Sequence, residues 1–399
     1  MPLPRSALYV LLASAVILAL SLGVRHSFGL FLEPMSQQFG WGREVFALAI
    51  ALQNLFWGFA QPFTGALADR FGAGKTVLAG GALYALGLAL MAHADSATSL
   101  SLSAGLLIGI GLSGTSFSVM LGAVGRAVPE HKRSMAMGIA AAAGSFGQFA
   151  MLPVALGLMD HFGWSQALMA MALLIALLLP LALTLKAAPT PTTLRTQSAT
   201  AAFKLAAQHS GFWLLSTGFF VCGFQVVFIG IHLPAYLIDE GISGNTATIV
   251  LALVGLFNIV GTYVAGWLGE RYCKSRLLCG LYLLRALVIG LFFILPTSIY
   301  SAYAFGIGIG LLWLSTVPLT NGSVATFFGV AHLSMLGGIV FLGHQLGSFM
   351  GGWLGGYMYD LTGSYDLIWQ LCIALSFIAA LINWPIQEGR ARKAQLWRV

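Results

Sequence analysis

The stretch Gly65-Ala66-Leu67-Ala68-Asp69-Arg70-Phe71-Gly72-Ala73-Gly74-Lys75 is a short charged turn between two long apolar runs. Its glycines allow two helix ends to come close, because a residue without a Cβ leaves room for a neighbouring backbone. Its Asp and two cations can interact with helix dipoles or form ion pairs that break and re-form. The pattern Gly-x-Leu-x-Asp-Arg-x-Gly-x-x-Lys therefore predicts a latch between helices.

An internal repeat places this turn in both halves of the chain. An offset of 201 residues carries it onto Gly266-Trp267-Leu268-Gly269-Glu270-Arg271-Tyr272, which repeats the Gly, the Leu, the acid-Arg pair and the aromatic residue. An offset of 200 carries Gly147-Gln148-Phe149 onto Gly347-Ser348-Phe349. The chain is therefore predicted to consist of two homologous halves.

The composition excludes a soluble globular protein. Hydrophobic residues make up 58% of the chain, charged residues 8%, and the mean hydropathy is +0.89, whereas about a quarter of the residues of a soluble protein are charged. The net charge of +7 does not indicate a nucleic-acid partner, because the cations lie in short loops between apolar runs. The cysteines show neither metal-site spacing nor a disulfide pattern, and we interpret them as packing residues: Cys222, Cys273, Cys279 and Cys372.

Twelve apolar runs are long enough to cross a bilayer, at about 20 residues each. We predict an all-α membrane protein with 12 transmembrane helices in two pseudo-symmetric six-helix bundles. The bundles cover residues 1–186 and 209–386, and a linker, 187–208, and a tail, 387–399, complete the chain. The predicted spans are 7–32, 44–68, 76–93, 98–122, 134–158, 164–186, 210–237, 245–268, 276–295, 298–320, 334–357 and 365–386.

Charge in the loops predicts the topology. Sixteen of the 19 Lys and Arg fall on the side of the two termini, and only Arg43 falls on the opposite side. The positive-inside rule then places both termini in the cytoplasm. We expect a multi-pass protein of the bacterial inner membrane.

Two cations, Arg25 and Arg285, lie inside predicted spans that contain no evident Asp or Glu. A guanidinium in hydrocarbon is costly and invites an anion. An alternative stays open, in which backbone carbonyls or the C-terminal end of a broken helix satisfy the arginine. Other polar residues at membrane depth either outline a substrate cavity or form hydrogen bonds between helices: His26, Gln53, Asn54, Gln148, His232, Asn258, His344 and Gln345.

The charged turn resembles the loop signature between helices 2 and 3 of the major facilitator superfamily. The stretch Gly23-Val24-Arg25-His26-Ser27-Phe28-Gly29-Leu30-Phe31-Leu32-Glu33-Pro34-Met35 resembles helix 1 of bacterial relatives of the monocarboxylate transporters. The resemblance implies a polar central cavity, and carriage of small organic anions, often with a proton, or anion exchange as in the oxalate and formate carriers.

The chain departs from that pattern in helix 8. The monocarboxylate carriers have an Asp and, four residues later, an Arg there, and our alignment places Asn258 and Thr262 at these positions. The Gly-Pro motif of drug-proton antiporters is also missing from helix 5, where Gly144-Ser145-Phe146-Gly147-Gln148 stands. The substrate therefore cannot be transferred from the resemblance alone.

We predict a secondary active transporter for a small organic anion, a carboxylate held by Arg25, working by alternating access as a monomer in the lipid bilayer. Coupled protons would use His26, His232 or His344, because the spans lack an evident acid. We expect no cofactor or metal. The alternatives are a proton-coupled drug or metabolite efflux carrier, a non-transporting receptor, and a membrane enzyme, which the missing HxxxH and HExxH pairs disfavour. The missing nucleotide loop disfavours an ATP-driven pump. The predicted latch comprises Gly65, Asp69, Arg70, Gly74, Lys75, Arg126, Glu270 and Arg271.

Overall fold

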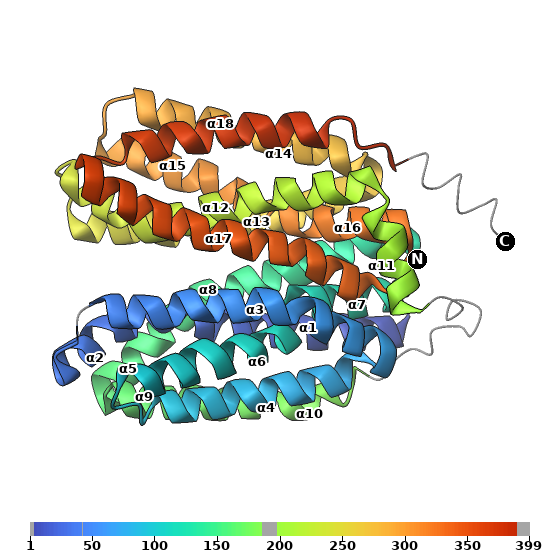
Figure 1. Ribbon diagram of the computed structural model, residues 1–399, viewed down its shortest axis with the longest axis horizontal. Coiled ribbons are helices and arrows are strands. Elements are labelled where there is room, and N and C mark those ends of the chain that lie inside the picture. The colour runs from blue at the N-terminus through green and yellow to red at the C-terminus, as the bar shows by residue number, and fades with distance from the viewer. Residues whose placement is uncertain (1–3, 42, 186–197, 389–399) are drawn as a thin grey trace. The chain divides into compact units, whose positions relative to one another are not determined.

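The computed structural model describes residues 4–41, 43–185 and 198–388, and these residues form helices joined by short turns (Figure 1). The chain divides into two compact units. Unit 1 comprises Met1–Pro129, Ala143–Gln197 and Val330–Gly338, and unit 2 comprises Glu130–Ala142, Ser198–Gly329 and Ile339–Val399. Each unit is described separately below.

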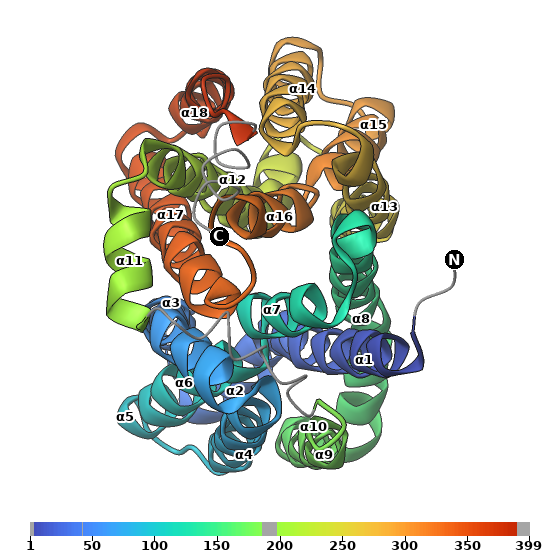
Figure 2. The same ribbon diagram turned by 90° about the vertical axis from the view of Figure 1, so that its right-hand side faces the viewer.

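Long helices run side by side in unit 1, and seen end-on α4 lies next to α6 (Figure 2). Helix α4 packs on both α6 and α9, and α1 packs on α7. The elements up to the middle of the chain are α1 (Arg5–His26), η1 (Ser27–Phe31), α2 (Leu32–Phe39), α3 (Arg43–Phe71), α4 (Ala73–Met91), α5 (Ala97–Leu100), the π-helical η2 (Ser101–Leu107), α6 (Ile108–Thr115), α7 (Phe117–Ala127), η3 (Glu130–Lys132), α8 (Arg133–Phe162), α9 (Trp164–Ala176) and α10 (Leu179–Ala182).

Unit 2 is built mainly from the second half of the chain. Helix α13 packs on α15, and α14 packs on α18. An aromatic cluster that includes Phe228, Phe292 and Trp369 fills the core between these helices. The elements of the second half are α11 (Ala199–Ala207), α12 (Ser210–Asp239), α13 (Gly244–Arg271), α14 (Lys274–Ile294), α15 (Ile299–Leu312), α16 (Thr316–Phe328), α17 (Leu333–Thr362) and α18 (Asp366–Asn383). The first residues of α17, up to Gly338, belong to unit 1.

The predicted spans coincide with helices throughout the described chain. Eleven helices in this part of the chain are long and apolar enough to cross a membrane. Helix α3 is 29 residues long, covers the predicted span 44–68, and is not one of the eleven.

The predicted spans 98–122 and 298–320 are each interrupted in mid-helix. The span 98–122 is divided at Ser116, whose backbone is extended, into α6 and α7. The span 298–320 is divided after Leu312, where Trp313, Leu314 and Ser315 separate α15 from α16. The two interruptions are about 200 residues apart and therefore lie at equivalent positions of the sequence repeat.

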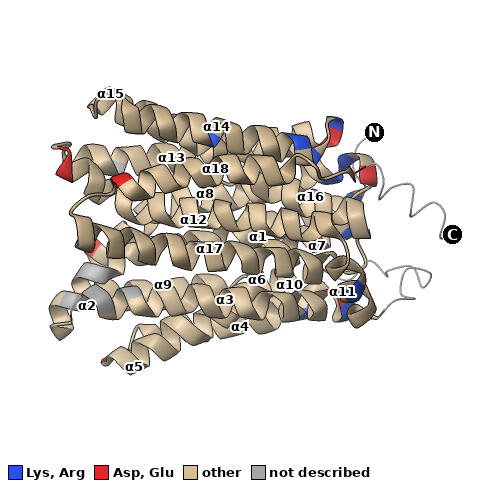
Figure 3. Cartoon of the chain, turned by 45° about the horizontal axis from the view of Figure 1, so that its top comes forward, with Lys and Arg blue, Asp and Glu red and all other residues tan. Residues whose placement is uncertain are grey.

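Charged residues collect at the helix ends, with Lys and Arg mostly at one end of the helices of each unit and Asp and Glu mostly at the other (Figure 3). Residues 198–208 of the predicted linker include the short helix α11, which begins at the capping residue Ser198. Residues 187–197 of that linker and residues 389–399 of the predicted tail lie outside the described chain.

Candidate functional site

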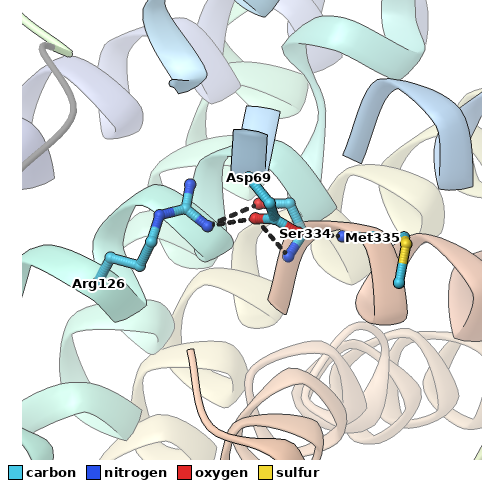
Figure 4. A network of polar contacts seen from close by, with 4 residues as sticks. All are labelled: Asp69, Arg126, Ser334 and Met335. Atoms are coloured by element: carbon cyan, nitrogen blue, oxygen red, sulfur yellow. Dashed lines mark hydrogen bonds and ion pairs between the residues drawn. The ribbon is translucent and has the colours of Figure 1, made fainter. Parts of the chain in front are cut away.

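Asp69 lies near the C-terminal end of α3 and accepts hydrogen bonds from the first turn of α17 (Figure 4). Its Oδ1 accepts the N–H of Ser334 at 3.1 Å and its Oδ2 accepts the N–H of Met335 at 2.8 Å. Nη1 of Arg126, from α7, forms an ion pair with Asp69 and donates to Ser334 Oγ at 3.1 Å. Because the first N–H groups of a helix have no partner within it and carry the positive end of its dipole, the carboxylate caps α17.

The first glycine of the motif permits this contact. A Cβ on Gly65 would lie 2.3 Å from the carbonyl oxygen of Ser334, and a Cβ on Gly122 would lie 2.0 Å from Ser334 Oγ. Real Cβ atoms do not come this close to oxygen atoms. Glycine at position 65 therefore allows the backbones of α3 and α17 to touch.

The other predicted latch residues of this half are not among the four residues drawn in Figure 4. The Arg70 guanidinium lies 5.0 Å from the centroid of the Phe71 ring. Lys75 is exposed. Gly74 allows α4 to approach the carbonyl oxygen of Ala182, which would lie 2.5 Å from an added Cβ.

The second half of the chain repeats the capping contact within unit 2. Glu270 Oε1, at the end of α13, accepts the N–H of Met135 in the first turn of α8 at 3.3 Å. A Cβ on Gly266 would lie 2.9 Å from the carbonyl oxygen of Ser134. An offset of 200 relates Ser134 and Met135 to Ser334 and Met335. An offset of 201 relates Gly65 and Asp69 to Gly266 and Glu270. Arg271, beside Glu270, stacks over Trp267 with 4.1 Å between the guanidinium and the ring centroid.

Arg25 lies in the last turn of α1 and is half-buried. Its Nη2 donates to Asn54 Oδ1 at 2.7 Å, and its guanidinium lies 5.5 Å from the centroid of the Trp57 ring. Its Nε is buried and has no hydrogen-bond partner within the described chain. Among the described side chains, Arg25 forms no ion pair with a carboxylate. Within the described chain, Arg25 is therefore oriented by neutral groups, and no carboxylate compensates its positive charge.

A buried network fixes the ring on which Arg25 rests. Trp57 Nε1 donates to Gln61 Oε1 at 2.9 Å and to Ser116 Oγ at 3.0 Å. Gln61 Nε2 donates to the Ser113 carbonyl at 2.8 Å. The acceptors Ser113 and Ser116 lie at the break between α6 and α7, so the interruption of this span positions Trp57 under Arg25.

The remaining candidates of unit 1 differ in their surroundings. Gln53 is fully buried, and its Nε2 donates to the Ala104 carbonyl of the π-helical η2 at 2.7 Å. This contact is a hydrogen bond between helices. His26 is exposed, and Gln148 of α8 is half-buried.

Arg285, midway along α14, is only 1% exposed. Its Nη2 and Nε donate to the Leu312 carbonyl at 2.6 and 3.2 Å, and Nη2 also donates to the Trp313 carbonyl. Nη1 donates to Gln225 Oε1 at 3.2 Å, and Nη2 approaches Cys222 Sγ at 3.5 Å. The two carbonyls belong to the C-terminal end of α15, the negative end of its dipole. Arg285 is thus satisfied by the carbonyls at the end of a broken helix, which is the alternative to an anion-binding role.

Asn258 and His232 hold helices of unit 2 together. Asn258 Oδ1 accepts the N–H of Leu314 at the break after α15, at 3.0 Å. Both ring nitrogens of His232 have partners, since Nδ1 lies 3.3 Å from Tyr365 Oη and Nε2 lies 2.9 Å from the Gly352 carbonyl.

His344 and Gln345 lie in α17 and are buried. His344 Nδ1 lies 3.2 Å from Gln345 Oε1 and 3.3 Å from Ser348 Oγ. The ring is parallel to that of Phe341, with 5.4 Å between centroids. His344 Nε2 is buried without a hydrogen-bond partner in the described chain.

Several residues of these sites were not predicted from the sequence. Trp57 was missed, because an aromatic residue in an apolar run carries no sequence signal for a cation contact. Cys222 was interpreted as a packing residue, and nothing near it in the sequence points to Arg285. Ser334 and Met335 contact Asp69 through backbone N–H groups, and Ser334 Oγ also accepts from Arg126. The repeat could have indicated both residues, because Ser134 and Met135 stand 200 residues earlier.

The family model described as Major Facilitator Superfamily matches residues 11–319. The chain belongs to this superfamily. It is 27% identical to the "Uncharacterized MFS-type transporter YcxA" of Bacillus subtilis, over 95% of each chain. It is 29% identical to "Monocarboxylate transporter 13" of Rattus norvegicus, over 91% of this chain and 84% of the relative.

Solved structures of the superfamily share the fold. The Escherichia coli fucose:proton symporter FucP superposes with a TM-score of 0.71 at 18% identity, covering 96% of this chain and all of that one. The proton:xylose symporter XylE superposes with a TM-score of 0.76 at 14% identity, covering 98% and 99%. These comparisons confirm the predicted major facilitator fold of 12 helices. The protein is a multi-pass membrane transporter and not an enzyme.

Proposed function

We propose that this transporter carries a small organic anion, a carboxylate, and that Arg25 is the group that binds it. The observation that carries the proposal is the set of contacts that the Arg25 guanidinium makes. Its guanidinium is held by Asn54 and by the Trp57 ring, its Nε has no partner in the described chain, and no described carboxylate pairs with it.

A carboxylate complements this arrangement. Arginine presents N–H donors in a planar fork that can bind two carboxylate oxygens at once. At membrane depth the pairing gains strength, because few water molecules compete for either charge. A neutral sugar would leave the guanidinium charge uncompensated, and a cationic drug would add to it.

The relatives named as monocarboxylate transporters support the same substrate class, at identities of 28% and 29%. The sugar symporters are below 20% identity and bear on the fold alone. In this proposal two six-helix bundles, residues 1–186 and 209–386, expose the site to each side of the membrane in turn. Both termini lie in the cytoplasm of a bacterial cell, and the transporter acts as a monomer.

A thermal-shift panel of monocarboxylates, dicarboxylates, aromatic acids, sugars and cationic drugs tests the proposal. A ligand that binds only the folded protein at about a hundred times its Kd stabilises it by about 2.7 kcal/mol. We expect a carboxylate to raise the melting temperature of the wild type and of Arg276→Gln, which removes an exposed cation stacked on Trp384. Arg25→Gln should fold and lose the response. Stabilisation by cationic drugs alone, unchanged in Arg25→Gln, would overturn the proposal in favour of efflux.

A further inference from the structure

Cys222 of α12 is fully buried against the guanidinium of Arg285. Its Sγ lies 3.5 Å from Arg285 Nη2 and 3.2 Å from Thr316 Oγ1. His344 of α17 is a further neighbour of the same thiol. The protonated thiol can also donate to the Trp313 carbonyl, at 3.9 Å. The sulfur therefore contacts a guanidinium, a hydroxyl and a carbonyl acceptor, of which the first two can serve the thiolate and the last the thiol.

No carboxylate of the described side chains compensates the charge of Arg285. The guanidinium stays protonated at any physiological pH. Its oxygen acceptors are two backbone carbonyls and the amide of Gln225, all of them neutral. Among the described side chains no Asp or Glu forms an ion pair with it. Of the side chains that contact Arg285 by hydrogen bonds, only Cys222 can become negative.

We infer that Cys222 and Arg285 form a proton-binding pair, and that the proton on Cys222 Sγ is the one that accompanies the substrate. Without the proton the pair is a thiolate beside a guanidinium, which is neutral as a whole. With the proton it is a thiol beside a guanidinium and carries one positive charge. Proton binding forms the S–H bond and proton release breaks it, while Arg285 remains protonated throughout.

The charge balance of the spans follows from this pair. Binding of one monocarboxylate at Arg25 lowers the charge within the spans by one unit, and protonation of Cys222 raises it by one. The loaded and the empty transporter then carry the same charge. Transport of one proton with one monocarboxylate would be electroneutral. This coupling step rests on the proposed function, whereas the ion pair itself does not.

The other groups around the pair fit this role. Thr316 can donate to a thiolate and accept from a thiol, because its hydroxyl rotates. His344, the further neighbour of the thiol, has its Nε2 buried without a hydrogen-bond partner in the described chain. Tyr282 lies on the same helix as Arg285, and the centroid of its ring is 5.6 Å from the guanidinium. Gln225 is held by the carbonyl of Cys372 and by Ser376 of α18.

A ligand-free titration of the purified full-length protein tests the ion pair. The ultraviolet absorbance of thiolate is followed against pH in a Cys273→Ser background, which removes the exposed thiol. We expect a thiolate signal that disappears on acidification and is absent once Cys222→Ser is added. Cys372→Ser, which removes a thiol that is also fully buried, should keep the signal. No thiolate signal at any pH at which the protein stays folded, or a signal that persists in Cys222→Ser, overturns the inference.

Proteoliposomes with a trapped pH dye test the coupling, with lactate as the probe and the voltage clamped. We expect lactate to drive proton uptake in the wild type and in Cys372→Ser. In Cys222→Ser uptake should fall to that of protein-free liposomes, while the lactate-induced thermal shift persists. Cys222→Asp should restore uptake with a pH profile moved to the acid side, because an Asp carboxyl ionises near pH 3.9 and a thiol near 8.5.

The two proposals fail in different ways. Unchanged proton uptake in Cys222→Ser, or lactate flux without protons in the wild type, overturns the coupling role of Cys222. If lactate and the other carboxylates produce neither a thermal shift nor flux in any variant, the proposed function fails, and the thiolate titration still decides the ion pair.

Discussion

Two arginines at membrane depth are used in different ways because different acceptors are within their reach. Arg285 meets the free carbonyls at the end of α15, and these occupy its Nε and Nη2. Arg25 meets the side-chain amide of Asn54 and a ring face. The interrupted helix α15 thus binds the guanidinium of Arg285 as part of the fold, whereas Arg25 keeps N–H donors for a ligand.

Arg285→Gln should destabilise the folded protein. The variant loses most of the donors that satisfy the Leu312 and Trp313 carbonyls, and a buried polar group left unsatisfied costs about 1–3 kcal/mol. We expect a lower thermal unfolding midpoint in detergent, whereas Arg276→Gln, at the exposed end of the same helix, should be almost unchanged. An unaltered midpoint combined with a lost carboxylate response would instead make Arg285 a substrate residue.

For single residues, the sequence predicted where the charged side chains lie along the chain but not which groups they contact. Arg25 and Arg285 stand out in apolar runs, and Asp69, which contacts Ser334, Met335 and Arg126, belongs to a recognisable motif. The partners of Arg285 depend on the helix ending at Leu312, and the stretch Leu312-Trp313-Leu314-Ser315 contains neither Gly nor Pro to announce a break. Tertiary contacts from Asn258 and Arg285 satisfy the backbone groups that the break frees.

At the scale of helices, an acid at the end of one helix caps the start of another in both units. Asp69 accepts two backbone N–H groups of α17 and pairs with Arg126, whereas Glu270 accepts one N–H of α8 at 3.3 Å. A negative group at a helix N-terminus contributes about 0.3–1 kcal/mol, and up to about 2 when partly buried. The contact of Asp69 should therefore be the stronger of the two.

Asp69→Asn should slow transport with little loss of substrate binding, and Glu270→Gln should slow it less. Both changes keep the shape of the side chain and remove its charge, so in Asp69→Asn the neutral amide no longer attracts the Arg126 guanidinium as an ion. Flux in proteoliposomes, compared with the ligand-induced thermal shift, separates the two effects. Full flux in Asp69→Asn would show that this contact is not a latch.

The helices themselves were predictable because their apolar runs are long and the turns between them are short. The sequence also predicted that Gly65 permits close approach, which the contact with Ser334 explains. Helix α11 was not expected within the predicted linker. Its short amphipathic pattern, with Ala202 and Ala206 buried and Phe203 exposed, is weak beside the runs that span the membrane.

For the molecule as a whole, the number of spans and the distribution of charge together predict which turn faces which side. If α3 crosses the membrane as the second of 12 helices, the turn between α13 and α14 lies on the side of both termini. The positive-inside rule makes this side cytoplasmic. Cys273 lies in that turn and is exposed, whereas Tyr300, near the start of α15, is 85% exposed and should face outward.

A membrane-impermeant maleimide applied to right-side-out vesicles should therefore leave Cys273 unlabelled until detergent is added. Tyr300→Cys in a Cys273→Ser background should react without detergent, because one span, α14, separates the two positions. The three other cysteines are buried and add little signal in either case. Labelling of Cys273 in intact vesicles, with Tyr300→Cys protected, would invert the predicted topology. Equal labelling at both positions would contradict α14 as a membrane-spanning helix.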